Sequence, residues 1–397
     1  MSTISADEYF DRLHRTSSLL DEENIKIIRT MKEQGPRNLQ KISRASKIPY
    51  TTVYSRVTKL ESAGLFNTYV HPNYSRIGLS QAMVLVTPFP GRELLAKESI
   101  RIPGYWLKIA RCIGECNGYY ALVAVPSSNT RDYEQYLDQL VARGLIKNSR
   151  VTWLGESISP IPNFAYYDFV KKTWSFDWKR WLGLFKHRDK VSARTPKPTN
   201  SNFDKRDLVI LKELTKDART TLVTLAKMLA ISLPAAKYRF EGLLKKGAIK
   251  DYVINVLPFA YDVSDLSEVR LDFKDETSLR NGQKALSELP FILTISPLKG
   301  LNSTNVRVYI PRVELNNLMT FLSLLVKDNI LTSYSYLQLD PMTLMTSSFG
   351  YRDYNDETGW FYDNRKYLVA VDNLLSNWPR REAEATTPPA IPVSSLQ

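Results

Sequence analysis

The segment 49–65, PYTTVYSRVTKLESAGL, places hydrogen-bonding side chains along one side of an expected helix. Val53, Val57 and Leu60 recur at helical spacing and predict a buried stripe, and Gly64 stands where such a helix would end. The exposed side carries donors and almost no acid, namely Thr51, Thr52, Tyr54, Ser55, Arg56 and Lys59. These groups can donate to base edges and phosphates, so the chemistry that they support is recognition. A polar face that is merely solvated is the alternative.

No group of residues in the sequence has the spacing of a catalytic or metal site. We find no nucleophile–base pair, no phosphate-binding loop and no metal-ligand spacing. His14, His71 and His187 are the only histidines, and none stands at ligand spacing from Cys112 and Cys116. The sequence therefore predicts no catalytic residue, no metal and no cofactor, and it indicates that the protein is not an enzyme.

The two cysteines, Cys112 and Cys116, bracket a predicted turn. We interpret them as a buried strand cysteine and a loop cysteine, with a redox switch as the alternative. Two cysteines provide no disulfide framework, which agrees with a reducing compartment.

Charge indicates a polyanionic partner. The 397 residues carry a net charge of +13. Residues 1–200 hold 30 basic and 18 acidic side chains, whereas residues 201–397 hold 24 and 23, so the basic excess lies in the first half. There is no apolar run of membrane-spanning length and no signal pattern near residue 1. We therefore expect no membrane partner, and a cytoplasmic, nucleoid-associated protein.

An internal repeat organises the chain. Residues 20–70 align without a gap with residues 203–253, so that Asp21 meets Asp204 and Arg56 meets Arg239. Each copy is followed by strand-like and helical stretches in the order β-α-β-β-α-β, which predicts an α+β unit with helices on one face of a small sheet. The expected domains are two helix-turn-helix domains, at 20–70 and 203–253, and two ferredoxin-like domains, at 79–157 and 266–340.

The segments outside these domains differ in composition. Residues 158–185 and 341–382 are aromatic extensions that we expect to pack against the sheet domains. Residues 186–202 have the composition of a basic linker, and residues 383–397 that of a disordered tail.

The first fifty residues of each unit follow a helix-turn-helix plan, whose last helix is sized for the DNA major groove. In the second copy Asp204 caps the first helix, the turn falls at 231–233, and Pro234 opens the third helix. Dimerisation or protein docking is the alternative use of such a unit. The expected DNA-binding residues are Arg44, Thr51, Thr52, Tyr54, Ser55, Arg56, Lys59, Lys227, Lys237, Tyr238 and Arg239. For Arg56 and Arg239, a phosphate contact and an intramolecular pair with Asp21 or Asp204 both stay open.

These residues resemble the Lrp/AsnC (feast/famine) transcription regulators. The resemblance rests on the Asp at the helix start, the Asp-Ala-Arg segment after that helix, and an Arg four residues before the Leu that precedes the terminal Gly. It implies a winged helix-turn-helix followed by a ferredoxin-like (RAM) domain that mediates association and can sense amino acids. Family members ordinarily carry one unit per chain. Two fused units therefore imply an archaeal-type pseudo-dimer within one chain, and they leave further homodimerisation open.

The resemblance also points to an effector site in the first sheet domain. Gly114, Glu115, Asn117 and Gly118 resemble the turn at which family members bind small effectors, with Asn117 where Asp is usual. The implied effector is an amino acid, and a plain hairpin turn is the alternative.

Together these features predict a sequence-specific transcription regulator that binds double-stranded DNA. The second reading helix offers fewer hydrogen-bonding groups, so we expect an asymmetric site read mainly by the first unit. A sequence-tolerant architectural DNA-binding protein is the main alternative. An enzyme resembling the siroheme decarboxylases, which share this architecture, is the less favoured one.

Overall fold

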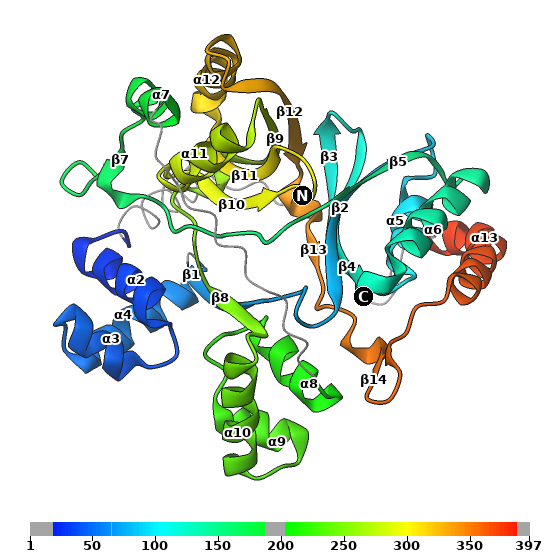
Figure 1. The fold of residues 1–397 in the computed structure, drawn as a ribbon, viewed down its shortest axis with the longest axis horizontal. Coiled ribbons are helices and arrows are strands. Elements are labelled where there is room, and N and C mark those ends of the chain that lie inside the picture. Colours follow the sequence, from blue (N-terminus) through cyan, green and yellow to red (C-terminus); the bar gives the residue numbers. More distant parts are fainter. Residues whose placement is uncertain (1–18, 65, 187–202, 387–397) are drawn as a thin grey trace, which may run out of the picture.

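The computed structural model describes residues 19–64, 66–186 and 203–386. It contains two helix-turn-helix heads, and the two sheet domains are joined into one sheet (Figure 1). The predicted linker and tail lie largely outside the described residues. No helix in the described ranges is long and apolar enough to cross a membrane.

The first head consists of α2 (Glu22–Gln34), α3 (Leu39–Ser46) and α4 (Tyr50–Ser62). The side chains of Asp21 and Asn38 accept backbone N–H groups of the first turns of α2 and α3, which fixes where these helices begin. Lys47 adopts a left-handed conformation, with φ of 56°, and turns the chain from α3 into α4.

The second head consists of α8 (Lys205–Leu214), α9 (Leu222–Leu229) and α10 (Leu233–Lys245). Asp204 caps α8, as the sequence predicts, and Thr221 and Ser232 cap the other two helices. Ala230, with φ of 51°, occupies the place that Lys47 has in the first head.

Each head is followed by the predicted β-α-β-β-α-β order. The first sheet domain contains β2 (Leu79–Pro88), α5 (Glu93–Arg101), β3 (Trp106–Gly114), β4 (Gly118–Pro126), α6 (Thr130–Ala142) and β5 (Ile146–Trp153). The second contains β9 (Ser264–Phe273), α11 (Glu276–Ser287), β10 (Ile292–Pro297), β11 (Ser303–Pro311), α12 (Leu315–Lys327) and β12 (Leu331–Leu339). The predicted α+β class with two tandem units is therefore confirmed.

The two sheet domains meet along two edges. At one edge β12 pairs with β3, where Leu337 faces Gly114 and Leu339 faces Cys112, and β13 (Met345–Thr346) continues the pairing along β3. At the other edge, residues 154–158, which follow β5, bridge to Ile295 and Leu298 in and after β10. Between these edges the inner faces of the two sheets share an apolar cluster. The two units thus contact each other along both edges, and the two contacts are pseudo-symmetric.

A two-stranded ribbon links the heads. β1 (Phe66–Pro72) follows the first head, β8 (Ile249–Val256) follows the second, and the two pair antiparallel with Val70 opposite Tyr252. Helix α2 packs on β8, and α8 packs on β1. Each head therefore rests on the strand that leaves the other head.

The aromatic extensions pack on sheet domains, but each packs on the domain of the other unit. Helix α7 (Trp178–Lys186), from the first extension, covers α11 and α12 through Trp181 and Phe185. Helix α13 (Asn364–Thr386), from the second, covers α5 and α6 through Tyr367 and Val371 (Figure 1). The short pairs β6 (Tyr167–Asp168) with β7 (Thr173–Trp174), and β14 (Tyr354–Asn355) with β15 (Gly359–Trp360), precede these helices.

The helices next to the predicted linker and the predicted tail extend past the predicted boundaries. Helix α7 ends at Lys186, which the sequence assigned to the linker, and residues 187–202 lie outside the described residues. Helix α13 continues to Thr386, so the predicted tail does not begin at residue 383. The apolar face of α13 packs on the first sheet domain through Tyr367, Val371 and Trp378. Residues 387–397 lie outside the described part.

Candidate nucleic-acid interface

Helix α4 presents a row of polar side chains to solvent. Val53, Val57 and Leu60 are fully buried in the first head, as the sequence predicts. The hydroxyls and cations of the opposite face are exposed or half-buried, and within the described ranges they make no side-chain hydrogen bond or ion pair; these residues are Arg44 on α3 and Thr51, Thr52, Tyr54, Ser55 and Lys59 on α4. Tyr50 and Tyr54 lie side by side, with ring centroids 6.3 Å apart. These six side chains, which the sequence predicts to bind DNA, are therefore accessible to solvent.

Arg56 and Arg239 are engaged inside their heads. The Arg56 guanidinium donates to Asp21, at 2.6 Å, and to Asn24, and it also pairs with Glu23. Arg239 donates to Asp204 and Asp207, each at 2.7 Å. Of the two alternatives that the sequence left open, the structure therefore shows the intramolecular pair. Each arginine ties its recognition helix to the N-terminus of the first helix of the head.

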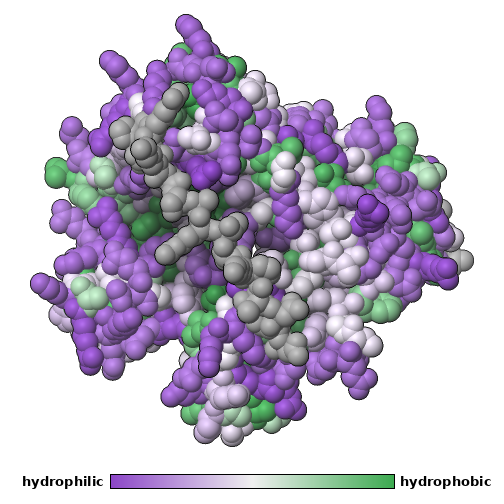
Figure 2. Space-filling view, in the orientation of Figure 1, coloured by the Kyte–Doolittle hydropathy of each residue, from purple (hydrophilic) through white to green (hydrophobic). Residues whose placement is uncertain are grey.

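The second head presents a more apolar surface than the first. On α10, Lys237 is exposed and lies 3.8 Å from Glu241, and the Tyr238 side chain is 79% exposed. Ala236 is buried, as expected. Val223, Met228 and Leu233 are about half exposed, where the first head carries Gln40, Ala45 and Tyr50. In Figure 2 both head lobes are mostly hydrophilic, with hydrophobic residues scattered over the second.

Direct contacts hold the two heads together. Arg37, before α3, donates to the carbonyls of Ala218 and Thr220, and its guanidinium lies 4.5 Å from the centroid of the Phe240 ring. Arg219 pairs with Glu61 at 2.6 Å, from the α8–α9 connection to the end of α4.

Sequence reasoning missed these head-to-head contacts because they break the repeat. Thr220 is the residue of the second copy that aligns with Arg37. This difference between the two copies, an arginine in one and a threonine in the other, is the signal that could have identified Arg37.

The predicted effector turn forms part of the contact between the units. The Glu115 carboxylate accepts from Ser335 at 2.6 Å and pairs with Arg150 at 2.5 Å, and the Glu115 backbone N–H donates to Tyr336. The Asn117 side chain accepts from the N–H of Gly114. These groups are already occupied, so the geometry favours the alternative of a structural turn.

A polar cluster lies between the two sheets, and the sequence analysis did not identify it. Arg307 donates to Glu268 at 2.7 Å and to the Tyr120 hydroxyl at 3.0 Å, and Asn305 donates to the second oxygen of Glu268. Glu268 and Arg307 face each other across β9 and β11, as Met83 and Leu122 do across β2 and β4. One unit thus carries an ion pair where the other carries an apolar pair. The ion pair is buried, and the bond from Arg307 to Tyr120 connects it to the first unit.

Two basic side chains whose pKa values are lowered, Lys108 and His71, interact electrostatically with groups of this region. Burial, reinforced by the charge of Arg307, lowers the pKa of Lys108 to about 7. Burial also lowers the pKa of His71 to about 4, with Lys250, Lys108 and Lys32 acting in the same direction and Asp251 opposing them. His71 is therefore neutral at pH 7, and its Nδ1, 4.0 Å from Asp251, forms no ion pair there.

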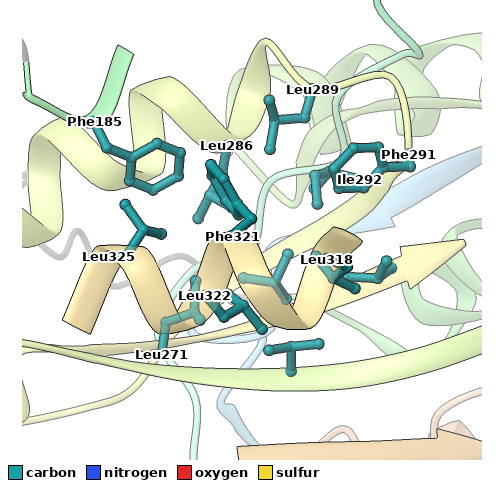
Figure 3. A pocket seen from close by; sticks show the side chains of 13 residues that line it. Phe185, Leu271, Leu286, Leu289, Phe291, Ile292, Leu318, Phe321, Leu322 and Leu325 are labelled. Atoms are coloured by element: carbon teal, nitrogen blue, oxygen red, sulfur yellow. The ribbon is translucent and has the colours of Figure 1, made fainter. Parts of the chain in front are cut away.

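The cavity shown in Figure 3 lies in the core of the second sheet domain, away from these groups. It is lined only by aliphatic and aromatic side chains, among them Phe185 of α7 and Phe321 of α12. Its free volume of about 10 Å³ is at the limit for one water molecule, and no lining group could bind that water. We regard it as a packing void.

Comparison with known proteins finds that parts of this chain are similar to DNA-binding regulators. A winged helix-turn-helix DNA-binding model matches residues 203–250, which form the second head. The regulator LrpA of Pyrococcus horikoshii is 36% identical over 90 residues, which are 23% of this chain and 63% of LrpA. The regulator LysM of Saccharolobus solfataricus is 44% identical over 55 residues, which are 14% of this chain and 39% of LysM.

The chain is similar to Lrp-type transcription regulators. This confirms the resemblance inferred from the sequence. The LrpA match spans less than two thirds of that relative, so it does not by itself assign an activity to the whole chain.

The fold as a whole is shared with an enzyme. The siroheme decarboxylase NirDL superposes with a TM-score of 0.50 at 12% identity, over 90% of this chain and all of that chain. The prediction from the sequence that the protein is not an enzyme is therefore wrong. It relied on the lack of a recognisable catalytic motif, whereas the same fold supports catalysis in NirDL. At this identity the likeness establishes the fold and no activity.

Proposed function

We propose that the protein is a sequence-specific DNA-binding transcription regulator of Lrp/AsnC type, acting on the nucleoid in the cytoplasm. Its two fused heads would act as a pseudo-dimer on one asymmetric DNA site. The observation that carries the proposal is the exposed, unbonded face of α4, where four hydroxyls and the Lys59 ammonium lie on a helix of the type that enters the major groove. No comparable observation supports effector binding at the turn formed by residues 114–118.

The two heads would contribute unequally. Thr52, Tyr54 and Ser55 on α4 can bond to base edges, whereas the exposed face of α10 offers Lys237 and Tyr238 beside apolar side chains. We expect the first head to set sequence preference, and the second to add phosphate contacts through Lys227 and Lys237.

Point variants of α4 test this division of roles. Lys59→Ala should weaken binding to all sequences alike and reduce the slope of log K against log salt by about 1. Thr52→Ala and Tyr54→Ala should instead change which bases are preferred, at a cost of about 1–3 kcal/mol on the best site. Binding is measured by titrating labelled duplexes at several salt concentrations. Lys26→Ala, which removes an exposed cation from α2 of the same head, is the matched control and should change neither quantity.

Two results would redirect the proposal. Strong binding with a steep salt slope but no preference among unrelated duplexes would favour the architectural alternative. Unchanged affinity and preference in all three α4 variants would remove α4 from the interface.

The largely buried basic groups Lys108 and His71 favour a second candidate function, the binding of a polycarboxylate such as a tetrapyrrole. NirDL has been crystallised with an iron-uroporphyrin III analogue, and Lys108 and His71 supply donors in the interior of the same fold. Titration with iron-uroporphyrin III while the absorbance of the macrocycle is recorded tests this candidate. A saturable spectral shift that is lost in Lys108→Met would support it, and an unchanged spectrum would reject it.

A further inference from the structure

The two thiols of the chain lie at the contact between its units. Cys112 is near the end of β3 and Cys116 is in the turn that leads to β4. Both side chains are buried in the apolar cluster between the sheets, whereas Glu115 and Asn117 on either side of Cys116 are exposed. A small opening of this turn is therefore enough to bring Cys116 to solvent.

The turn places the two cysteines, four residues apart, in one apolar cluster. Cys112 pairs with Gly118 across the hairpin, so the intervening residues fold back over a short span. The Thr87 hydroxyl lies 3.5 Å from the Cys116 sulfur. Neither thiol is near a set of groups that could hold a metal, since no three His, Cys, Asp or Glu side chains gather in the described part of the chain.

The two thiols have unequal acidities. The hydrogen bond from Cys112, followed by the bond from Thr87 and the charge of Arg150, lowers the pKa of Cys116 to about 6 against the opposing effect of burial. The same hydrogen bond and burial raise the pKa of Cys112. Cys116 is therefore the nucleophile at neutral pH, and Cys112 is positioned to resolve the product.

We infer that Cys112 and Cys116 form a reversible dithiol–disulfide pair, oxidised by small hydroperoxides. The Cys116 thiolate attacks the peroxide, so that an S–O bond forms, the O–O bond breaks, and hydroxide leaves to take up a proton as water. The Cys112 sulfur then attacks the Cys116 sulfur, so that the S–S bond forms and the S–O bond breaks. The released hydroxide takes the Cys112 proton as a second water. Two thiols lose two electrons, and hydrogen peroxide is reduced to two waters.

The position of the pair couples its oxidation state to the contact between units. Cys112 faces Leu339 of the second unit, and the Glu115 N–H donates to the Tyr336 carbonyl. Gly114 has a φ of 120°, and a Cβ there would lie 2.7 Å from the Tyr336 carbonyl oxygen. The backbones of the two units therefore pack here with no space for a side chain. A disulfide that draws Cys116 away from Thr87 must shift this turn. We expect faster amide exchange at Glu115 after oxidation.

The test uses the full chain treated with hydrogen peroxide. Thiols are counted with Ellman's reagent in denaturant, and peptides are mapped by mass spectrometry without reduction. The expected result is two free thiols before treatment, none after it, a Cys112–Cys116 linked peptide from monomeric protein, and both thiols restored by dithiothreitol. The oxidation rate should rise with pH around a midpoint near 6, because the thiolate is the reactive form.

Variants separate the two roles. In Cys112→Ser, peroxide should leave a sulfenic acid at Cys116 that dimedone traps, whereas Cys116→Ser should lose the fast reaction. Thr87→Val removes one hydrogen bond to Cys116 and should move the rate midpoint to higher pH. Two thiols that survive peroxide, a disulfide between separate chains, or over-oxidation of either cysteine without a linked peptide would each overturn the inference. None of these readouts depends on DNA binding.

Discussion

At the scale of single residues, Arg56 and Arg239 show what the sequence could and could not settle. Their equivalent positions in the two copies indicated a shared role, but spacing alone does not tell whether a guanidinium contacts DNA or its own head. The acidic residues at the start of α2 and α8 settle the question, because they already bind these arginines. The exposed hydroxyls of α4, in contrast, could be assigned from helical periodicity alone, since burial of one stripe fixes what faces out.

Replacement of Asp204 tests the link between α8 and α10. Asp204→Ala removes both the cap of α8 and the partner of Arg239, so we expect the free energy of unfolding to fall by about 1–3 kcal/mol. Asp204→Asn keeps a capping oxygen and should lose less. Urea unfolding followed by circular dichroism measures both. Equal stability of wild type and Asp204→Ala would contradict the assigned role.

Stability at low pH should depend on the same carboxylate. Burial opposes its charge, but hydrogen bonds from Asp207 and Arg239 outweigh burial and hold the pKa of Asp204 below its ordinary value. Its contribution is therefore fully present at neutral pH and is lost as pH falls through that lowered pKa. Asp204→Asn should remove this part of the acid dependence, which unfolding curves at stepwise lower pH can measure.

At the scale of elements, the repeat and its β-α-β-β-α-β order could be predicted, whereas the partners of the elements could not. Strand and helix periodicities are local properties, so β2 to β5 and β9 to β12 followed from the sequence. The pairing of β1 with β8 and the exchange of α7 and α13 depend on which copy of a near-symmetric surface each element covers. Glu268 and Arg307 were missed because an isolated charge in a strand does not show its partner.

Arg37 tests whether the head-to-head contact fixes the distance between the reading helices. Arg37→Ala removes two hydrogen bonds and the contact with Phe240, so the heads should become less tightly coupled. We expect the variant to bind the best DNA site with lower affinity than wild type. When base pairs are inserted between the two halves of that site, its affinity should fall by less than that of wild type. Titration of a series of duplexes with altered spacing measures this. Arg29→Ala, an exposed arginine on α2, is the control, and an unchanged spacing profile in Arg37→Ala would contradict the prediction.

At the scale of the whole molecule, the two units are interlocked. The core of the first sheet domain includes residues of α8 and α13, which belong to the second unit, and the core of the second sheet domain includes Trp181 and Phe185 of the first. The sequence predicted two fused copies of one unit that associate as a pseudo-dimer. The structure shows two units that complete each other's cores, so neither should be stable alone.

Cleavage between the units tests this interlocking. A protease site inserted between residues 187 and 202 allows the chain to be cut after folding. Because α7 and α13 remain packed on opposite units, the two fragments should elute together at the size of the intact chain, and they should separate only in denaturant. Separation under native conditions would show that the exchange contributes little to association.

The central claim is most directly tested by selecting genomic DNA fragments with the purified full chain at near-physiological salt. The selection is repeated with a Thr52→Ala, Tyr54→Ala, Lys59→Ala triple variant and with the Lys26→Ala control. The account predicts an enriched, asymmetric motif with wild type and control, and loss of its better-defined half with the triple variant. Fragments recovered without an enriched sequence, or a motif that the triple variant still selects, would contradict a regulator that reads DNA through α4.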